Sequence, residues 1–217
     1  GAIIIGKANL SEFANSGHFS ESAFGKVWNA FDPSKSSIGS SGGSAVAVAT
    51  SMAAAALGTQ TGDSLWGPSS AASLVSLRGT DGLTTCQGVM PLTYIQDYCG
   101  AITRTPEDQA LLLNAIAQAD PEDETQALEG AGWAGKRPAE WRSALDPNAL
   151  QGKTIGFYPA AFADPFGTTD TSARLQEQFK YFTAAGASVV QIEPPPSAPN
   201  RSEYFTGDTN YEGWLKW

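Results

Sequence analysis

A run of serine and glycine leads directly into a nearly all-apolar segment, and this junction constrains the fold more than any other feature. The run is "SSIGSSGGS", residues 36–44, and "AVAVATSMAAAAL", residues 45–57, follows it. Alanine has the highest helix propensity and Ser44 is a suitable N-cap, so we expect a helix over residues 45–57. A helix without a polar face must be buried on every side. The chain therefore needs a large core around this helix.

Several other segments carry local signals of regular structure. The opening stretch "AIII", residues 2–5, predicts a buried strand, and residues 69–77 predict a short helix. We expect short strands or extended segments in "GLTT" and "YIQDYCGAIT". The segment "TPEDQALLLNAIAQAD", residues 105–120, predicts a helix, because Thr105 can cap it and Pro106 suits its first position.

The C-terminal part of the chain alternates between strand and helix patterns. "KTIGFYP" predicts a strand, "TSARLQEQFKYFTAAG" predicts an amphipathic helix that Gly186 closes, and "ASVVQIEPP" predicts a second strand. This alternation over residues 153–192 favours a parallel βαβ unit. Residues 122–150 are polar and rich in Gly and Pro, so we expect them to form surface loops and helix fragments.

The charge balance excludes some classes of partner. Lys and Arg total 13 against 22 Asp and Glu, which gives a net charge of −9. We expect no nucleic-acid partner, because phosphate binding needs clustered Lys and Arg. No apolar run is long enough to span a bilayer, so we expect no membrane partner.

Cys86 and Cys99 can form one disulfide or remain buried thiols. Together with the acidic composition, the two cysteines slightly favour a secreted protein over a cytoplasmic one.

Both ends of the chain lack the features of a domain end. Residues 1–6 begin in a strand pattern, and "YEGWLKW" stops inside an apolar pattern with no cap or turn. We therefore expect the chain to be a piece of a longer protein, with the remainder of its own chain as a partner.

The Ser/Gly run matches few catalytic loops. No Lys follows its glycines, so it is not a phosphate-binding P-loop, and the spacing of dinucleotide-binding loops is absent. Gly39, Ser41 and Gly43 formally match the nucleophile elbow G-x-S-x-G of esterases. That elbow follows a buried strand and needs a later histidine, whereas the one histidine, His18, precedes the run. With one His and two Cys, a metal site is also unsupported.

A serine nucleophile without a histidine needs another base, and Lys7 is the candidate. It follows "AIIIG" at the end of the expected buried strand, where a lysine is otherwise out of place. Burial disfavours the charged ammonium, and a neutral amine can accept a proton. A lysine at a strand end can equally extend its ammonium into solvent, and on Lys7 alone that alternative is favoured.

Several motifs in series resemble the amidase signature family. "GKANLSEFA" resembles the family's lysine motif, "GSSGGSAVAVA" its Gly/Ser signature and "ALGTQTGDSLWGPSS" its nucleophile loop. "LRGTDGLTTCQGVMPL" and "DYCGAITRT" resemble the segments that follow. The resemblance implies an α/β fold, a mixed β-sheet flanked by helices on both faces, seen here in part. Residues 1–217 would form a fragment of one amidase signature domain, with a signature core over 1–120 and a peripheral region over 121–217.

The resemblance also implies a Ser–cis-Ser–Lys triad. Ser64 matches the nucleophile, Ser40 matches the bridging serine on a cis peptide, and Lys7 matches the base. Protons would pass from Ser64 to Ser40 and on to Lys7, and Ser64 would form an acyl-enzyme. The oxyanion would be stabilised by backbone N–H groups of the loop: Thr61, Gly62, Asp63 and Ser64. The implied reaction is hydrolysis of a small-molecule or peptide amide, without a cofactor.

Three residues of the loop depart from the family pattern. Asp63 stands where the family usually has Gly, Gln60 replaces an Asp, and Trp66 replaces an Arg that many members carry. The Arg would anchor acidic substrates, whereas a Trp offers an apolar wall, so we expect a neutral, fairly apolar acyl group. Trp66 and Ser41 are therefore candidate substrate-binding residues.

Two alternative functions stay open. An esterase-type hydrolase would use Ser41 as nucleophile, with a histidine outside this sequence. A non-catalytic binding or assembly subunit would explain why Asp63 and Gln60 depart from the family's loop. Asp97 and Arg104 match family positions after the loop, and we interpret them as structural partners rather than catalytic residues. A homodimer is also left open.

Overall fold

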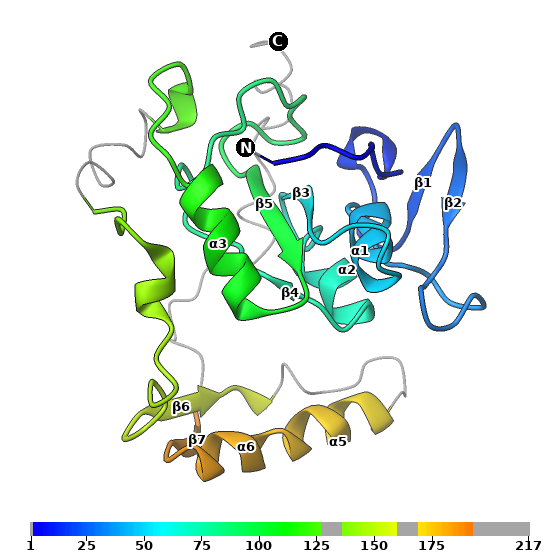
Figure 1. Cartoon of the computed structure of the whole chain (residues 1–217). Coiled ribbons are helices and arrows are strands. Elements are labelled where there is room, and N and C mark those ends of the chain that lie inside the picture. Colours follow the sequence, from blue (N-terminus) through cyan, green and yellow to red (C-terminus); the bar gives the residue numbers. More distant parts are fainter. Residues whose placement is uncertain (1, 127–135, 160–168, 193–217) are drawn as a thin grey trace. The chain divides into compact units, whose positions relative to one another are not determined.

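The computed structural model describes residues 2–126, 136–159 and 169–192, which divide into two compact units (Figure 1). One unit lies within residues 1–144 and the other within residues 145–207. The bounds of the elements in chain order are η1 Glu12–Ala14, β1 Ser20–Ser22, β2 Gly25–Val27, α1 Gly42–Ala49, β3 Ala56–Gln60, α2 Trp66–Ala71, β4 Val75–Ser76, β5 Tyr98–Thr103, α3 Pro106–Ile116, η2 Trp141–Ala144, β6 Thr154–Phe157, α5 Thr169–Glu177, α6 Phe179–Ala184 and β7 Ser188–Gln191. The assignment of both units to one domain stays a prediction.

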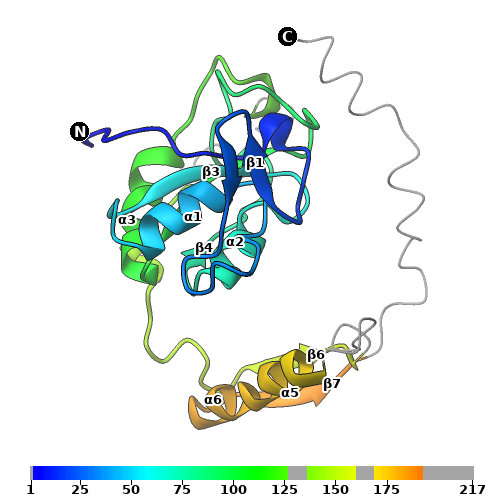
Figure 2. The ribbon, with the colours of Figure 1, turned by 90° about the vertical axis from the view of Figure 1, so that its right-hand side faces the viewer.

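A three-stranded antiparallel sheet in the order β3-β5-β4 forms the centre of the first unit. The pairing of β3 with β5 ends where Gln60 lies opposite Tyr98. Helix α3 packs against β5 from one side, and α1 packs against β3 and β5 from the other (Figure 1, Figure 2). The sheet, the helices and the connecting segments share one apolar core: Ala45, Leu65, Ala72, Leu83, Tyr98, Ile102, Leu113 and Ala117.

The second unit is a βαβ unit. Strands β6 and β7 pair in parallel, and α5 and α6 lie between them in the chain. Gly186 ends α6 with a φ of +86°, a conformation that glycine adopts without strain. The βαβ unit expected over residues 153–192 is confirmed, although its helix is interrupted at Gln178. The described ranges thus combine helices with an antiparallel sheet in one unit and a parallel strand pair in the other.

The apolar segment that follows the Ser/Gly run divides into a helix and a strand. The single helix expected over residues 45–57 is wrong: α1 covers the first part, and the end of the segment enters β3. Ser51, at a φ of +60°, breaks the helical path. Pairing with β5 then outweighs the helix propensity of the alanines before Leu57. Ser44, the expected N-cap, lies inside α1, and its Oγ donates a hydrogen bond to the carbonyl oxygen of Leu57 (2.7 Å).

The helices α2 and α3 differ in how far local signals predict them. Helix α3 begins at Pro106 as expected, and Oγ1 of Thr105 accepts a hydrogen bond from the N–H of Asp108 (3.1 Å). Helix α2 begins and ends earlier than the expected 69–77, because residues 75–76 form β4 beside β5. "GLTT" forms turns rather than a strand, and "YIQDYCGAIT" contains β5 in its second half.

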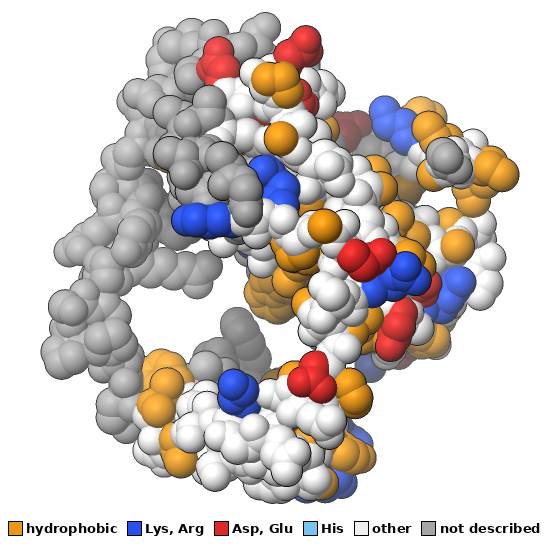
Figure 3. Space-filling view, turned by 60° about the vertical axis from the view of Figure 1, so that its left-hand side comes forward, with side chains coloured by type: hydrophobic (Ala, Val, Ile, Leu, Met, Phe, Trp, Pro, Cys, Tyr) orange, Lys and Arg blue, Asp and Glu red, His pale blue; other side chains and the backbone are white. Residues whose placement is uncertain are grey.

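Residues 2–5 do not form the expected buried strand. They are not assigned to a strand, and Ile3 and Ile4 are 89% and 90% exposed. A strand needs a neighbour for its backbone hydrogen bonds, and no strand of the described ranges pairs with this segment. Other hydrophobic side chains are also exposed at the surface (Figure 3), among them Phe24 and Met52. Within the region 122–150, where we expect loops and helix fragments, the described part holds helical residues at 124–126 and the short helix η2.

Candidate active site

Ser40 lies in a tightly packed turn just before α1. The peptide bond between Gly39 and Ser40 is cis, which is the backbone geometry that the family resemblance implies for this serine. A Cβ at Gly39 would lie 2.2 Å from two carbonyl oxygens within residues 16–19, so only glycine fits there. The carbonyl oxygen of Ser40 accepts hydrogen bonds from the N–H of Ser11 and Oγ of Ser20, both at 3.0 Å. The preceding segment therefore fixes the turn.

The other serines of the Ser/Gly run use their hydroxyls in hydrogen bonds. Three donate to backbone carbonyl oxygens: Ser36, Ser37 and Ser44. Ser41 is fully buried; its Oγ donates to the carbonyl oxygen of Thr59 and accepts from the N–H of Thr59, both at 3.1 Å. The Oγ of Ser40, by contrast, makes no hydrogen bond to any residue of the described ranges, although Ser40 is only 1% exposed. Ser40 is therefore the serine of this run whose hydroxyl is available for other chemistry.

A backbone hydrogen bond joins this turn to the loop that carries Ser64. The N–H of Ser41 donates to the carbonyl oxygen of Ser64 (3.2 Å). Ser64 follows β3 and is 4% exposed, and its hydroxyl also makes no hydrogen bond within the part of the chain that the structure describes. The fold thus brings together the segments of Ser40 and Ser64, and both hydroxyls are unengaged.

Gln60 holds the turn that follows Ser64. Its side chain is 4% exposed, and Oε1 accepts hydrogen bonds from the N–H groups of Leu65 (2.9 Å) and Trp66 (3.0 Å). These N–H groups stand at the start of α2, where a helix has no backbone acceptors of its own. From the sequence, Gln60 is only a departure from the family pattern; its spacing of five residues from Leu65 did not reveal this contact.

The backbone between Thr61 and Leu65 offers unengaged donors. The N–H groups of Gly62, Asp63 and Ser64 make no hydrogen bond to a described residue. The space beside Gly62 is open, because a Cβ there would meet nothing within 4 Å. The carboxylate of Asp63 lies against Gly17, where an added Cβ would be 2.5 Å from Oδ1. The Asp63 side chain is therefore directed at a neighbouring turn.

Asp97 connects the loop that carries Ser64 to a second loop. Its carboxylate accepts hydrogen bonds from Oγ1 of Thr61 (2.5 Å) and from the N–H groups of Leu92 (2.7 Å) and Thr93 (3.1 Å). Burial raises the pKa of Asp97 above its ordinary value, although the three hydrogen bonds oppose this shift. Arg104 donates from Nη1 to carbonyl oxygens at and just beyond the end of α1. Both residues thus make the structural contacts that we expect for them.

Two predicted site residues lie at the surface of the structure. Lys7 is exposed, and its side chain makes no hydrogen bond or ion pair to any described residue. The expectation that Lys7 ends a buried strand is wrong, because no neighbouring strand of the described ranges pairs with residues 2–5. The Lys7 amine is not shielded from water by any described residue. Trp66 lies in α2 and is 56% exposed.

A pocket of about 730 Å³ lies beside Thr61, in the loop that carries Ser64. Thr59 and Thr61 contribute to its wall from β3 and the loop, and most of the apolar lining residues lie within residues 86–92. Four lining residues carry carboxylates: Asp97, Glu122, Asp123 and Glu124. None of the lining residues in the described ranges is Lys, Arg or His. The described lining residues therefore disfavour an anion in this pocket.

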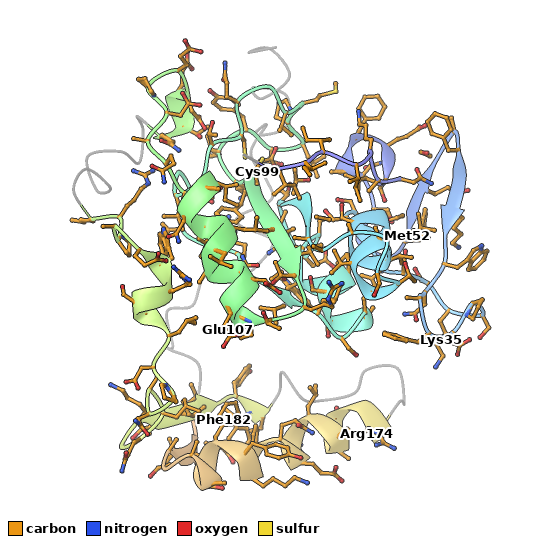
Figure 4. The ribbon with its side chains drawn as sticks, in the orientation of Figure 1. Lys35, Met52, Cys99, Glu107, Arg174 and Phe182 are labelled. Carbon is orange, nitrogen blue, oxygen red and sulfur yellow. The ribbon has the colours of Figure 1, made fainter. Side chains whose placement is uncertain are left out.

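Cys86 and Cys99 are free thiols that lie next to each other. Figure 4 shows Cys99 at the start of β5, and Cys86 lines the pocket. Sγ of Cys86 donates to the carbonyl oxygen of Asp97 (3.8 Å). The hydrogen bond to Cys86 and burial raise the pKa of the Cys99 thiol far above its ordinary value.

The described residues offer neither a metal site nor a membrane helix. Within them, no three His, Cys, Asp or Glu side chains converge to form a metal site. In the same ranges no helix has both the length and the hydropathy to cross a bilayer.

Known proteins resemble this chain in both sequence and fold. The sequence model of the family "Amidase" matches residues 1–209. A glutamyl-tRNA(Gln) amidotransferase subunit from Gloeobacter violaceus is 37% identical over 205 residues, which are 94% of this chain and 40% of that protein. The native peptide amidase of Stenotrophomonas maltophilia is 35% identical with a TM-score of 0.76, covering 90% of this chain and 40% of that one. The corresponding glutamyl-tRNA(Gln) amidotransferase subunit from Thermotoga maritima is 31% identical with a TM-score of 0.78, covering 89% of this chain and 40% of that one.

The matches cover nearly all of this chain but less than half of each relative. This chain spans about 40% of the length of the curated relatives it matches. The family model, however, covers nearly all of this chain, and the matched structures share its α/β fold at more than 30% identity. The chain therefore belongs to the amidase family.

Proposed function

We propose that the protein containing this chain hydrolyses carboxylic amides, with Ser64 as nucleophile, Ser40 as proton relay and Lys7 as base. One observation carries the proposal: two buried serines with unengaged hydroxyls lie on segments that a backbone hydrogen bond holds together. Membership of the amidase family supports the reaction class. The name of the peptide amidase from Stenotrophomonas maltophilia supports an amide as substrate.

In the proposed reaction, Oγ of Ser64 attacks the carbonyl carbon of the amide. The proton of Ser64 passes to Ser40 while the proton of Ser40 passes to Lys7. The N–H groups of Gly62, Asp63 and Ser64 donate hydrogen bonds to the oxyanion. The C–N bond then breaks, the amine leaves with the proton that the relay returns, and water hydrolyses the acyl-enzyme to the acid. No cofactor takes part. The role of Lys7 requires an environment that removes its amine from water, because a solvated lysine stays protonated.

The esterase-type alternative receives no support from the contacts of Ser41. Its hydroxyl is fully buried and is used as both donor and acceptor by the backbone of Thr59. A nucleophile must have its oxygen free to approach a carbonyl carbon. We therefore assign Ser41 a structural role, in place of the nucleophilic or substrate-binding role expected from the sequence.

The non-catalytic alternative loses one of its two supports. Gln60 provides the acceptor that the start of α2 needs, so its departure from the family pattern has a structural explanation. Asp63 remains as the other departure, and its carboxylate lies against Gly17. A binding subunit without activity therefore stays only as an outcome of the test below.

The substrate that we propose is a small-molecule or peptide amide with a neutral acyl group. Two observations support this choice: Trp66 stands where many family members carry an Arg, and four carboxylates line the pocket beside Thr61. The remainder of the longer protein is its proposed partner within the fold. Two relatives are named as amidotransferase subunits, so we propose light scattering of the full-length protein to decide between a monomer, a homodimer and a complex.

The test uses the full-length protein and single substitutions of each serine. With amide substrates that release ammonia, we expect Ser64→Ala to abolish turnover and Ser40→Ala to reduce it by about 1,000-fold or more. A serine-directed fluorophosphonate should label Ser64 in the wild-type protein, and peptide mass spectrometry locates the label. Ser69→Ala is the matched control, because Ser69 is also buried but lies inside α2.

Three outcomes would contradict the proposal. Turnover that survives Ser64→Ala would exclude Ser64 as nucleophile. Labelling of Ser41 in place of Ser64 would favour the esterase-type alternative. A folded wild-type protein without turnover or label would favour the binding subunit.

A further inference from the structure

Asp97 stands at the point where the sheet ends and the nucleophile loop begins. The last pair of the β3–β5 ladder is Gln60 opposite Tyr98. The next residues on the two strands are Thr61 and Asp97, and here a side-chain hydrogen bond from Oγ1 of Thr61 to Oδ1 of Asp97 takes over from the ladder. This contact therefore sets the position at which the chain leaves β3 and turns toward Ser64.

The same carboxylate also holds the wall of the pocket. Oδ2 of Asp97 accepts the N–H of Leu92 at 2.7 Å, and both of its oxygens lie 3.1 Å from the N–H of Thr93. Leu92 and Thr61 both line the pocket. One side chain thus joins the loop that carries the nucleophile to the loop that forms the pocket wall.

Only a carboxylate satisfies this set of three donors. Ionised Asp has two acceptor oxygens and no donor, so it can accept hydrogen bonds at both oxygens. An Asn of the same shape would present an NH₂ group to one side, where it would face an N–H or O–H donor. The three hydrogen bonds of Asp97 are also charge-assisted, which makes them stronger than neutral ones.

The far side of the loop has its own support. Oε1 of Gln60 holds the N–H groups of Leu65 and Trp66, immediately after Ser64. Between the two anchors, the N–H groups of residues 62–64 make no hydrogen bond to a described residue. The loop is thus held at both ends while its middle keeps three donors for another molecule.

We propose that Asp97 is a positioning residue for the reaction proposed above: through Thr61 it aims the N–H groups of residues 62–64, and through Leu92 and Thr93 it couples them to the pocket wall. The inference rests on the proposed function, in which those N–H groups bind the oxyanion. An oxyanion site works only when its donors are fixed before the reaction. Loss of this support lowers kcat more than it raises KM, because the donors act on the transition state.

The test is a double-mutant cycle in the full-length protein with an amide substrate. Asp97→Asn and Thr61→Val should each lower kcat by about 10- to 100-fold, with KM changed by less than about threefold. The double variant should have a kcat no lower than that of the less active single variant, because both substitutions remove the same contact. Thr61→Ser keeps the hydroxyl and should restore most of the wild-type kcat.

Asp120→Asn is the matched control. Asp120 accepts hydrogen bonds from Oγ1 of Thr85 (2.8 Å) and from the N–H of Glu122 (3.0 Å), so it makes the same kind of contact in the same unit. It does not line the pocket. We expect kcat of Asp120→Asn within about twofold of wild type, even where its thermal stability falls.

A second readout does not depend on activity. Hydrogen–deuterium exchange of the peptide that spans residues 61–66 should become faster in Asp97→Asn and stay unchanged in Asp120→Asn. Unchanged exchange in Asp97→Asn, or effects on kcat that add in the double variant, would overturn the inference. Ser64→Ala in the same assays separates the two proposals: if it abolishes turnover while Asp97→Asn has no effect, the amidase function stands and the role of Asp97 does not.

Discussion

A single buried glutamine determines how the loop that carries Ser64 ends. Gln60 supplies one oxygen to two N–H groups at the start of α2, one of which belongs to the fully buried Leu65. The amide oxygen is a neutral acceptor, so it does this without placing a formal charge in the interior. The Asp that the family usually has at this position would offer the same type of oxygen with a charge.

Replacing Gln60 with Leu should destabilise the protein. The buried N–H of Leu65 would lose its acceptor, which typically costs about 1–3 kcal/mol. Urea denaturation of the full-length protein measures this loss. Gln118→Leu is the control, because Gln118 is exposed just after α3 and donates to the carbonyl oxygen of Asn114; its free energy of unfolding should stay within about 0.5 kcal/mol of wild type. Equal losses for both variants would contradict the role of Gln60.

The two cysteines should react at different rates. The thiolate is the nucleophile in alkylation, and the raised pKa of Cys99 leaves almost no thiolate at a pH of about 8. Cys86 lines the pocket, so iodoacetamide should label Cys86 first in the native full-length protein. Peptide mass spectrometry reports the two rates, and in urea they should become similar. A disulfide-linked peptide in the unreduced protein, or equal native rates, would refute this expectation.

At the scale of elements, packing rather than flexibility explains the turn before α1. Gly39 lies against two carbonyl oxygens of the preceding segment, whereas the space beside Gly62 is open. Neither residue has a positive φ, so their backbone conformations do not by themselves require glycine. The contrast separates a glycine needed for close approach from one that merely has room.

Gly39→Ala should therefore damage the fold where Gly62→Ala does not. A Cβ 2.2 Å from a carbonyl oxygen cannot be accommodated without moving the turn, and such overpacking costs about 1–3 kcal/mol or more. Thermal denaturation of the two full-length variants gives the comparison. A Gly39→Ala protein as stable as Gly62→Ala would mean that residues 16–19 move aside easily.

Local signals predicted some elements and failed for others, for physical reasons. The cap and first-turn proline specify α3 within a few residues, and Gly186 marks the end of α6. The end of the apolar segment enters β3 because pairing with β5 decides its conformation, and this pairing joins residues far apart in the chain, such as Gln60 and Tyr98. Residues 2–5 have the composition of a strand, but composition does not supply the neighbour that a strand requires.

Sequence motifs indicated the two candidate serines, but they did not indicate the long-range contacts around them. The Ser/Gly run and the loop around Ser64 pointed to the two serines from sequence alone. The contact between Thr61 and Asp97 spans 36 positions, and no local pattern marks it. The exposure of Lys7 differs from the expectation for the same reason as residues 2–5: its burial depends on a neighbour.

At the scale of the molecule, the acidic balance of the chain extends into the pocket beside Thr61. The net charge is −9, and four carboxylates are among the residues that line the pocket beside the loop that carries Ser64. Asp97 and Asp123 already accept hydrogen bonds from backbone N–H groups, while Glu122 is exposed. An anionic substituent would therefore meet repulsion with no cation among the described lining residues to offset it.

A pair of amides that differ only in a terminal carboxylate or carboxamide should reveal this repulsion. We expect kcat/KM for the anionic amide to be lower by about tenfold or more, since one like-charge contact near a surface costs about 1–4 kcal/mol. The difference should shrink at about 1 M salt, because screening shortens the reach of the charges. Glu122→Gln should also reduce the difference in kcat/KM between the two amides. Faster hydrolysis of the anionic amide would refute the expectation.

The stretch from residue 36 to residue 44 looks like a low-complexity sequence, yet its serines are not interchangeable. Each of Ser36, Ser37, Ser41 and Ser44 has its own carbonyl partner, and Ser40 alone keeps a hydroxyl without one among the described residues. A permuted stretch of identical composition would keep every residue type and lose these specific hydrogen bonds. A search that masks repetitive segments would thus hide a stretch whose order, rather than composition, carries the information.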